Sequence, residues 1–78
     1  MDIKPKLEKQ RSGIYLVKDR DTERFLGRVE RTDDTRPAWY AYDADGRPIR
    51  AGFGFANGYT YLRSAAVARV VKAATREP

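Results

Sequence analysis

Four short segments of this chain have the hydrophobic patterns of β-strands. Residues 13–18 are a run of β-branched, aliphatic and aromatic side chains, and apolar and polar positions alternate in residues 24–31. Residues 38–42 and 47–53 continue in the same way. Short segments with this composition and a period of two are typical of strands. We therefore predict an antiparallel sheet of three or four strands.

Turn-forming residues separate these segments. The acidic residues of the turns and loops form three pairs: Asp19/Asp21, Asp33/Asp34 and Asp43/Asp45. Aspartate is favoured in turns because its carboxylate accepts hydrogen bonds from nearby backbone amides, so we assign these pairs to turns. Gly46 supplies the positive φ that a tight turn needs. Pro48 indicates that the fourth segment is an edge strand.

The last part of the chain has helical spacing, and Ser64 is the predicted N-cap. One side of this helix is apolar and consists of Ala66, Val67, Val70, Val71 and Ala74. The opposite side is basic, with Arg69, Lys72 and Arg76. Such an amphipathic helix buries its apolar side against another element. We predict an α+β fold in which this C-terminal helix packs on one face of the sheet, against residues such as Phe25, Val29 and Trp39.

The first eleven residues are polar and basic. Their cations are Lys4, Lys6, Lys9 and Arg11. Pro5 disfavours an early helix, and Ile3 and Leu7 are the main apolar side chains after Met1. We predict that residues 1–11 form a flexible basic arm and that residues 12–78 form a single small domain.

Histidine and cysteine are absent from the 78 residues, whereas arginine and aromatic residues are abundant. The commonest general base, the thiol nucleophile and the usual zinc ligands are therefore missing. We expect no enzymatic activity, no metal site and no cofactor. Arginine and aromatic side chains are enriched on binding surfaces, so the composition indicates a noncatalytic binding module.

The net charge of +5 attracts polyanions over long distances. No segment approaches the ~18 apolar residues of a membrane span. The N-terminus lacks the apolar stretch of a secretory signal. We expect a cytoplasmic protein that does not associate with membranes.

Strand alternation predicts a surface of arginine and tyrosine on the sheet face that the helix leaves free. Arg24 and Arg28 share one side of the second segment, and Arg50 lies on the fourth. Tyr40 and Tyr42 of the third segment can lie beside them. Arginine binds phosphates and base edges, and tyrosine stacks on bases. The alternative is a solvated face on which acidic residues balance the arginines.

Glycine and phenylalanine alternate in residues 52–55, similar to the core of the RNP1 motif, whose aromatic residues stack on RNA bases. The match is partial, because Ala51 stands where that motif has a basic residue. We favour packing of Phe53 or Phe55 in the core, and the same holds for Trp39. If exposed, these three aromatic residues are the candidate anchors for a protein partner.

The order of three strands, the Trp39-Tyr40-Ala41 sequence, the Asp45-Gly46 turn and the alanine-rich helix resembles two known arrangements. One is the arm-type DNA-binding domain of tyrosine recombinases, related in shape to plant ethylene-response domains. The other is a group of short bacterial proteins with three strands and a helix. The first resemblance, over residues 13–75, implies a three-stranded sheet that enters the major groove of DNA. The long second loop and residues 52–55 depart from that pattern.

These features predict nucleic-acid binding, with DNA favoured over RNA, through the arginine and tyrosine surface and the basic arm. The alternative is a protein-binding regulator or inhibitor of the kind that phages and mobile elements encode. Exposed sheet edges in so short a chain also allow a homodimer.

Overall fold

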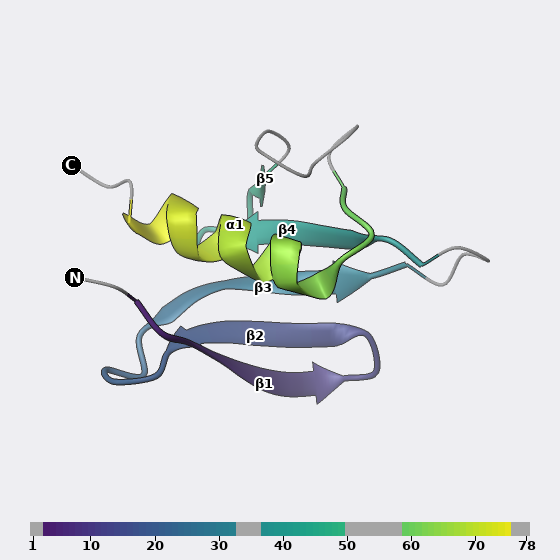
Figure 1. Cartoon of the computed structure of the whole chain (residues 1–78). Coiled ribbons are helices and arrows are strands. Elements are labelled where there is room, and N and C mark those ends of the chain that lie inside the picture. The colour runs from purple at the N-terminus through teal and green to yellow at the C-terminus, as the bar shows by residue number, and fades with distance from the viewer. Residues whose placement is uncertain (1–2, 33–36, 50–58, 76–78) are drawn as a thin grey trace.

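The computed structural model describes residues 3–32, 37–49 and 59–75, and it contains an antiparallel sheet followed by one helix (Figure 1). The strands are β1 (Pro5–Arg11), β2 (Ile14–Asp19), β3 (Phe25–Arg31), β4 (Trp39–Asp43) and β5 (Pro48–Ile49). They lie side by side in chain order. The helix, α1, spans Arg63–Thr75. The predicted α+β class, with a C-terminal helix on an antiparallel sheet, is confirmed.

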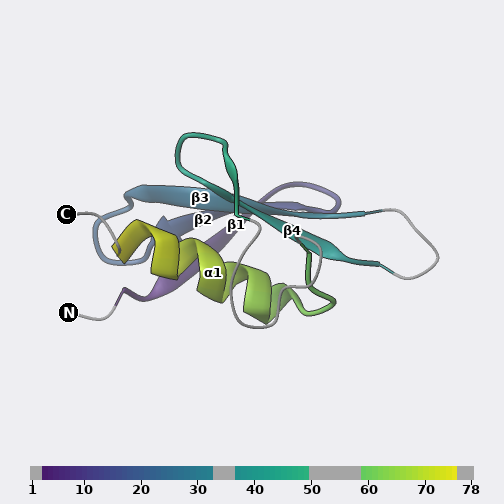
Figure 2. The same ribbon diagram turned by 90° about the horizontal axis from the view of Figure 1, so that it is seen from above.

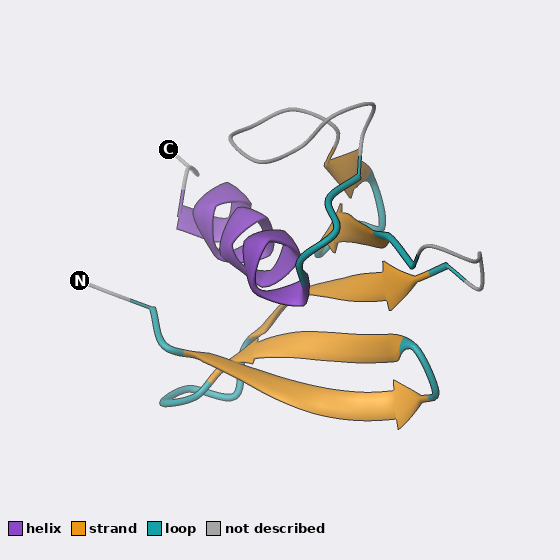
Figure 3. Ribbon diagram, turned by 45° about the vertical axis from the view of Figure 1, so that its right-hand side comes forward, coloured by secondary structure: helices purple, strands orange, loops and turns teal. Residues whose placement is uncertain are grey.

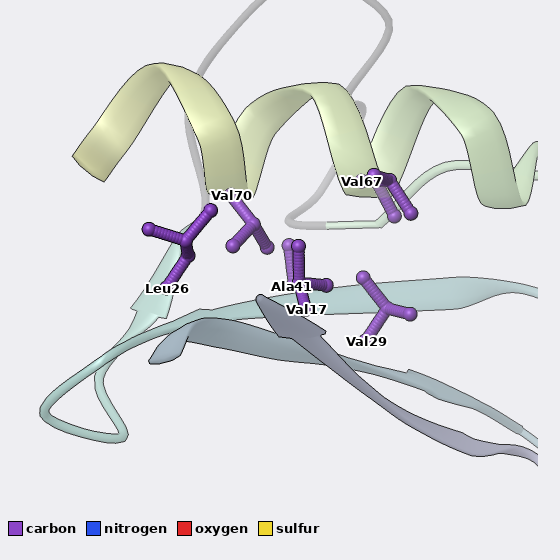
Figure 4. Close-up of a cluster of buried hydrophobic side chains, with 7 residues drawn as sticks. Val17, Leu26, Val29, Ala41, Val67 and Val70 are labelled. Carbon is purple, nitrogen blue, oxygen red and sulfur yellow. The ribbon is translucent and has the colours of Figure 1, made fainter. Parts of the chain in front are cut away.

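α1 packs on one face of the sheet, over β3 and β4, so that the molecule has two layers (Figures 2 and 3). The buried core residues of the sheet are Val17, Leu26, Val29 and Ala41, and those of the helix are Ala66, Val67 and Val70 (Figure 4). Val71, Ala74 and Trp39 pack partly buried against this cluster. The predicted apolar side of the helix is confirmed. Burial of each large aliphatic side chain contributes about 1.5–3 kcal/mol.

A β-bulge in β3 changes which side chains reach the core. Val17 pairs with Gly27 but Lys18 pairs with Phe25, so Leu26 is an extra residue between the two pairs. The bulge directs Leu26 into the core, where it is 2% exposed, and leaves Phe25 39% exposed. The prediction that Phe25 packs under the helix is therefore wrong, because strict alternation does not hold across the bulge.

The helix approaches the sheet closely at Gly27. A Cβ atom at this position would lie 2.8 Å from Val70 Cγ1 and 2.2 Å from the backbone oxygen of Tyr42. The φ angle of Gly27 is 153°. A larger residue has no room here, so glycine sets how near α1 lies to β3 and β4.

Residues 5–11 are part of the sheet. They form β1, which pairs with β2 and has Leu7 packed against the core. The prediction of a flexible arm over residues 1–11 is corrected for this stretch. The hydrophobic pattern gave no signal because β1 is an edge strand with mostly exposed side chains, and backbone hydrogen bonds hold it in place.

The predicted turns and element ends are close to those observed. The Asp43 carboxylate accepts hydrogen bonds from the amides of Asp45 and Arg47, and Gly46 has a φ of 83°. Pro48 lies in β5 at the sheet edge, as predicted, and residues 50–53 lie outside the described residues. The prediction of Ser64 as the N-cap is wrong, because α1 begins at Arg63 and Ser64 lies inside the helix.

Substitution of Val70 by aspartate should unfold the domain. Val70 is fully buried, so the carboxylate would be placed without a partner under the sheet, at a cost of about 4 kcal/mol or more. The single core of so small a domain supplies only about 3–5 kcal/mol. Thermal unfolding followed by circular dichroism measures the effect. The control is Ala68→Asp, at an exposed position of the same helix. Equal melting temperatures for the two variants would show that the helix does not pack as described.

Candidate functional site

The sheet face opposite α1, called here the open face, is not covered by any helix of the described residues. Val17, Val29 and Ala41 point toward α1, so the residues that alternate with them point the other way. The strand register aligns Leu16, Arg28 and Tyr42 in one row across this face. Its apolar and aromatic side chains are Ile14, Leu16, Phe25, Tyr40, Tyr42 and Pro48.

Tyrosine rings form a connected group at one end of the open face. The backbone of Thr60 forms a β-bridge with Trp39, and the buried Thr60 side chain points to the helix side. The flanking Tyr59 ring therefore lies against Tyr40, with 6.1 Å between ring centroids. Tyr61 meets Tyr59 edge to face at 5.5 Å, with the two hydroxyl oxygens 3.5 Å apart. The surface of Tyr40, Tyr42, Tyr59 and Tyr61 is called here the tyrosine row.

Two cations at the centre of the open face, Lys18 and Arg28, are paired with carboxylates. The Lys18 ammonium lies 3.0 Å from Glu8, and the Arg28 guanidinium donates a hydrogen bond to Glu30. Arg28 also stacks on Tyr42, with its guanidinium carbon 4.1 Å from the ring centroid. This contact is a cation–π interaction, worth about 0.5–1 kcal/mol at an exposed site. These two ion pairs therefore contribute little net charge to this face.

Lys6 belongs to the same set of ion pairs. Its ammonium donates a hydrogen bond of 3.0 Å to Glu23, in the turn between β2 and β3. This hydrogen bond, together with the positive charge of Lys6, holds the pKa of the Glu23 carboxyl below its ordinary value. The pair is exposed, so its effect on stability is small.

The structure brings three of the sequence-predicted nucleic-acid residues together: Arg28, Tyr40 and Tyr42. Arg24 precedes β3 and lines a small cavity near the turn between β4 and β5. Arg50, Phe53 and Phe55 lie outside the described residues. Tyr59 and Tyr61 were not predicted, because their place beside Tyr40 depends on the bridge to Trp39, which no local pattern reveals.

The remaining predicted residues lie elsewhere. Lys4 and Arg11 are exposed at the two ends of β1, and Lys9 lies on the helix side of that strand. Trp39 also faces the helix side, half-buried, with its ring centroid 6.0 Å from that of Tyr15. It therefore does not form part of the open face.

Two of the predicted turn aspartates, Asp19 and Asp43, stabilise their turns. The Asp19 and Asp43 carboxylates accept hydrogen bonds from the backbone amides of Asp21 and Asp45. No group of three His, Cys, Asp or Glu side chains in residues 3–32, 37–49 and 59–75 could hold a metal ion. Within the same residues, α1 is too short and too polar to span a bilayer.

Comparisons with known proteins give no relative for this chain. No protein-family model matches it, and no curated protein or solved structure is significantly similar to it.

Removal of Lys6 should raise the pKa of Glu23 toward its ordinary value, because the hydrogen bond and the positive charge that lower it disappear in Lys6→Met. A lowered carboxyl pKa stabilises the fold above the pKa of the unfolded chain, and this contribution is lost as the pH falls through the lowered value. An NMR titration of the Glu23 carboxyl carbon measures the shift. Lys4→Met is the control and should leave the Glu23 pKa unchanged, whereas equal effects of the two variants would contradict the pairing.

Proposed function

We propose that this protein binds single-stranded nucleic acid without catalysis, through the open face of its sheet. The observation that carries the proposal is the tyrosine row, in which Tyr40, Tyr59 and Tyr61 are in successive ring contact and Tyr42 lies on the same sheet face beneath Arg28. Tyr40, Tyr42 and Tyr59 are half-buried, so their rings are held in place while part of each remains accessible. Rings fixed in this way lose little conformational entropy when a base stacks on them.

The charges of this face favour a single strand over a duplex. The commonest specific contact to base edges in the major groove uses a free guanidinium or ammonium donor. On the open face Arg28 already bonds Glu30, and Lys18 already bonds Glu8. Stacking on aromatic rings requires unpaired bases and tolerates any sequence. The tyrosine row supplies the stacking surface, and the net charge of +5 supplies attraction to phosphates.

Truncation of Tyr40 should weaken binding of a single-stranded oligonucleotide. Tyr40→Ala removes one ring of the tyrosine row, and loss of one base–aromatic stack costs ~1–3 kcal/mol, or about 5- to 100-fold in affinity. Fluorescence anisotropy with a labelled single-stranded DNA measures the change. The same sequences as RNA and as duplex DNA are measured in parallel, and we expect single-stranded DNA to bind most tightly.

Two controls separate stacking from other effects. Tyr40→Phe keeps the ring and should bind within about twofold of the parent protein, because stacking does not need the hydroxyl. Arg20→Ala removes one charge at an exposed position in the turn between β2 and β3, two strands away from β4, and should bind nearly as well as the parent protein. The proposal is wrong if duplex DNA binds more tightly than either single strand, or if Tyr40→Ala binds as well as Tyr40→Phe.

A protein partner is the second candidate, favoured by the same ion pairs. A face that combines Ile14, Leu16 and Phe25 with tyrosines and internally balanced charges also has the composition of a protein interface. Binding of this kind depends little on moderate salt. Capture of one stoichiometric partner that persists after nuclease treatment and in raised salt, and that Leu16→Glu abolishes, would favour it over nucleic acid.

A further inference from the structure

A basic cleft lies on the other side of the sheet, where α1 begins. Because α1 packs over β3 and β4, the ends of β1 and β2 near their connecting turn extend beyond it (Figures 1 and 3). The space between this hairpin and the start of the helix is a cleft of about 210 Å³. At ~30 Å³ per water molecule it has room for a ligand several times larger than water. We call it the basic cleft and define it by Lys9, Arg31, Arg63, Tyr15 and Trp39.

Three cations converge on the basic cleft from three different elements. Lys9 comes from β1, Arg31 from the end of β3 and Arg63 from the start of α1. None of the three has a carboxylate partner among the described residues, in contrast to Lys18 and Arg28 of the open face. The first turn of α1 also contains no acidic residue. Like charges gathered without a counter-charge repel each other, so an anion bound between them lowers the free energy of the folded state.

Local contacts hold the basic cleft in shape. The Arg63 guanidinium carbon lies 5.1 Å from the centroid of the Tyr15 ring. The Arg31 side chain extends over Gly13, whose missing Cβ would lie only 3.9 Å from Arg31 Nε. Tyr15 and Trp39 contact each other at a tilt of 44° and form an aromatic wall. The arginines are therefore placed beside flat rings, and they carry donors that can bind one oxyanion group.

We propose that the basic cleft binds a nucleoside phosphate, with Lys9, Arg31 and Arg63 around the phosphate group and the base against Tyr15 and Trp39. Arginine donors match phosphate oxygens in a bidentate manner, and the aromatic wall suits a planar base. An acidic peptide would use the same cations, but its carboxylate side chains bring no planar ring to the aromatic wall. The phosphate belongs to a free nucleotide or to the end of an oligonucleotide. This site is separate from the open face and does not depend on the function proposed for it.

Trp39 is the one tryptophan of the 78 residues and lies in the cleft, so its fluorescence reports on the site directly. The parent protein is titrated with adenosine monophosphate, adenosine and inorganic phosphate at constant ionic strength. We expect a saturable change in emission with the nucleotide, a weaker effect of phosphate and none with adenosine. Saturation should also raise the melting temperature, because the ligand binds only the folded chain. An oligonucleotide with and without a terminal phosphate then distinguishes a free nucleotide from a chain end.

Variants locate the bound phosphate. Arg31→Ala and Arg63→Ala should each weaken nucleotide binding on the order of tenfold, the loss expected for one charge-assisted hydrogen bond. Arg20→Ala is the matched control, since it removes the same charge at an exposed turn outside the cleft. All three positions are exposed, so circular dichroism should show an unchanged fold. Tyr40→Ala should leave nucleotide binding in the basic cleft intact. This variant therefore tests the open-face proposal and the basic-cleft proposal separately.

The proposal is overturned by any of four results. These are no saturable change in Trp39 emission, equal responses to adenosine and to the nucleotide, an equal loss in Arg20→Ala and Arg31→Ala, and tighter binding of an acidic peptide than of the nucleotide. The last result would assign the basic cleft to a protein partner.

Discussion

The close contact between α1 and β3 at Gly27 determines the rest of the architecture. Val70 fills the space that a side chain at Gly27 would occupy, and this contact fixes the helix over β3 and β4. One helix cannot cover a sheet of five strands. Among the surfaces that the described helix leaves free are the opposite face and the part of β1 and β2 that extends beyond the start of the helix. Both candidate binding surfaces therefore follow from the position of a single helix.

Charge separates these two surfaces. On the open face Lys18 and Arg28 each lie beside a carboxylate, so the aromatic rings are its distinctive chemical feature. The basic cleft has rings as well as cations that have no carboxylate partner in residues 3–32, 37–49 and 59–75. The net positive charge of the chain therefore cannot be assigned to the arginine and tyrosine face, although strand alternation alone suggested it. Part of that charge lies on the helix side, at Lys9, Arg31 and Arg63.

Local sequence patterns were sufficient to predict most of the fold and half of the tyrosine row. Helical spacing identified the buried side of α1, and alternation placed Arg28 on the same face as Tyr40 and Tyr42. Alternation failed at Phe25, because a bulge shifts the register by one residue. It also missed β1, which is held in the sheet by backbone hydrogen bonds to β2 and whose own side chains show no clear hydrophobic pattern. Tyr59 and the basic cleft arise from contacts between distant segments, and such contacts have no signature in a single sequence.

The meander order of the strands has a consequence for how the chain folds. Each strand pairs with its neighbour in sequence, so the hairpins require only short loop closures and can form early. The helix that buries Val17, Val29 and Ala41 follows all of the strands in the chain. During synthesis the apolar side of the sheet therefore stays exposed to solvent until α1 leaves the ribosome. Over that interval the nascent sheet is prone to aggregation, and the charged side chains of β1 protect one of its edges.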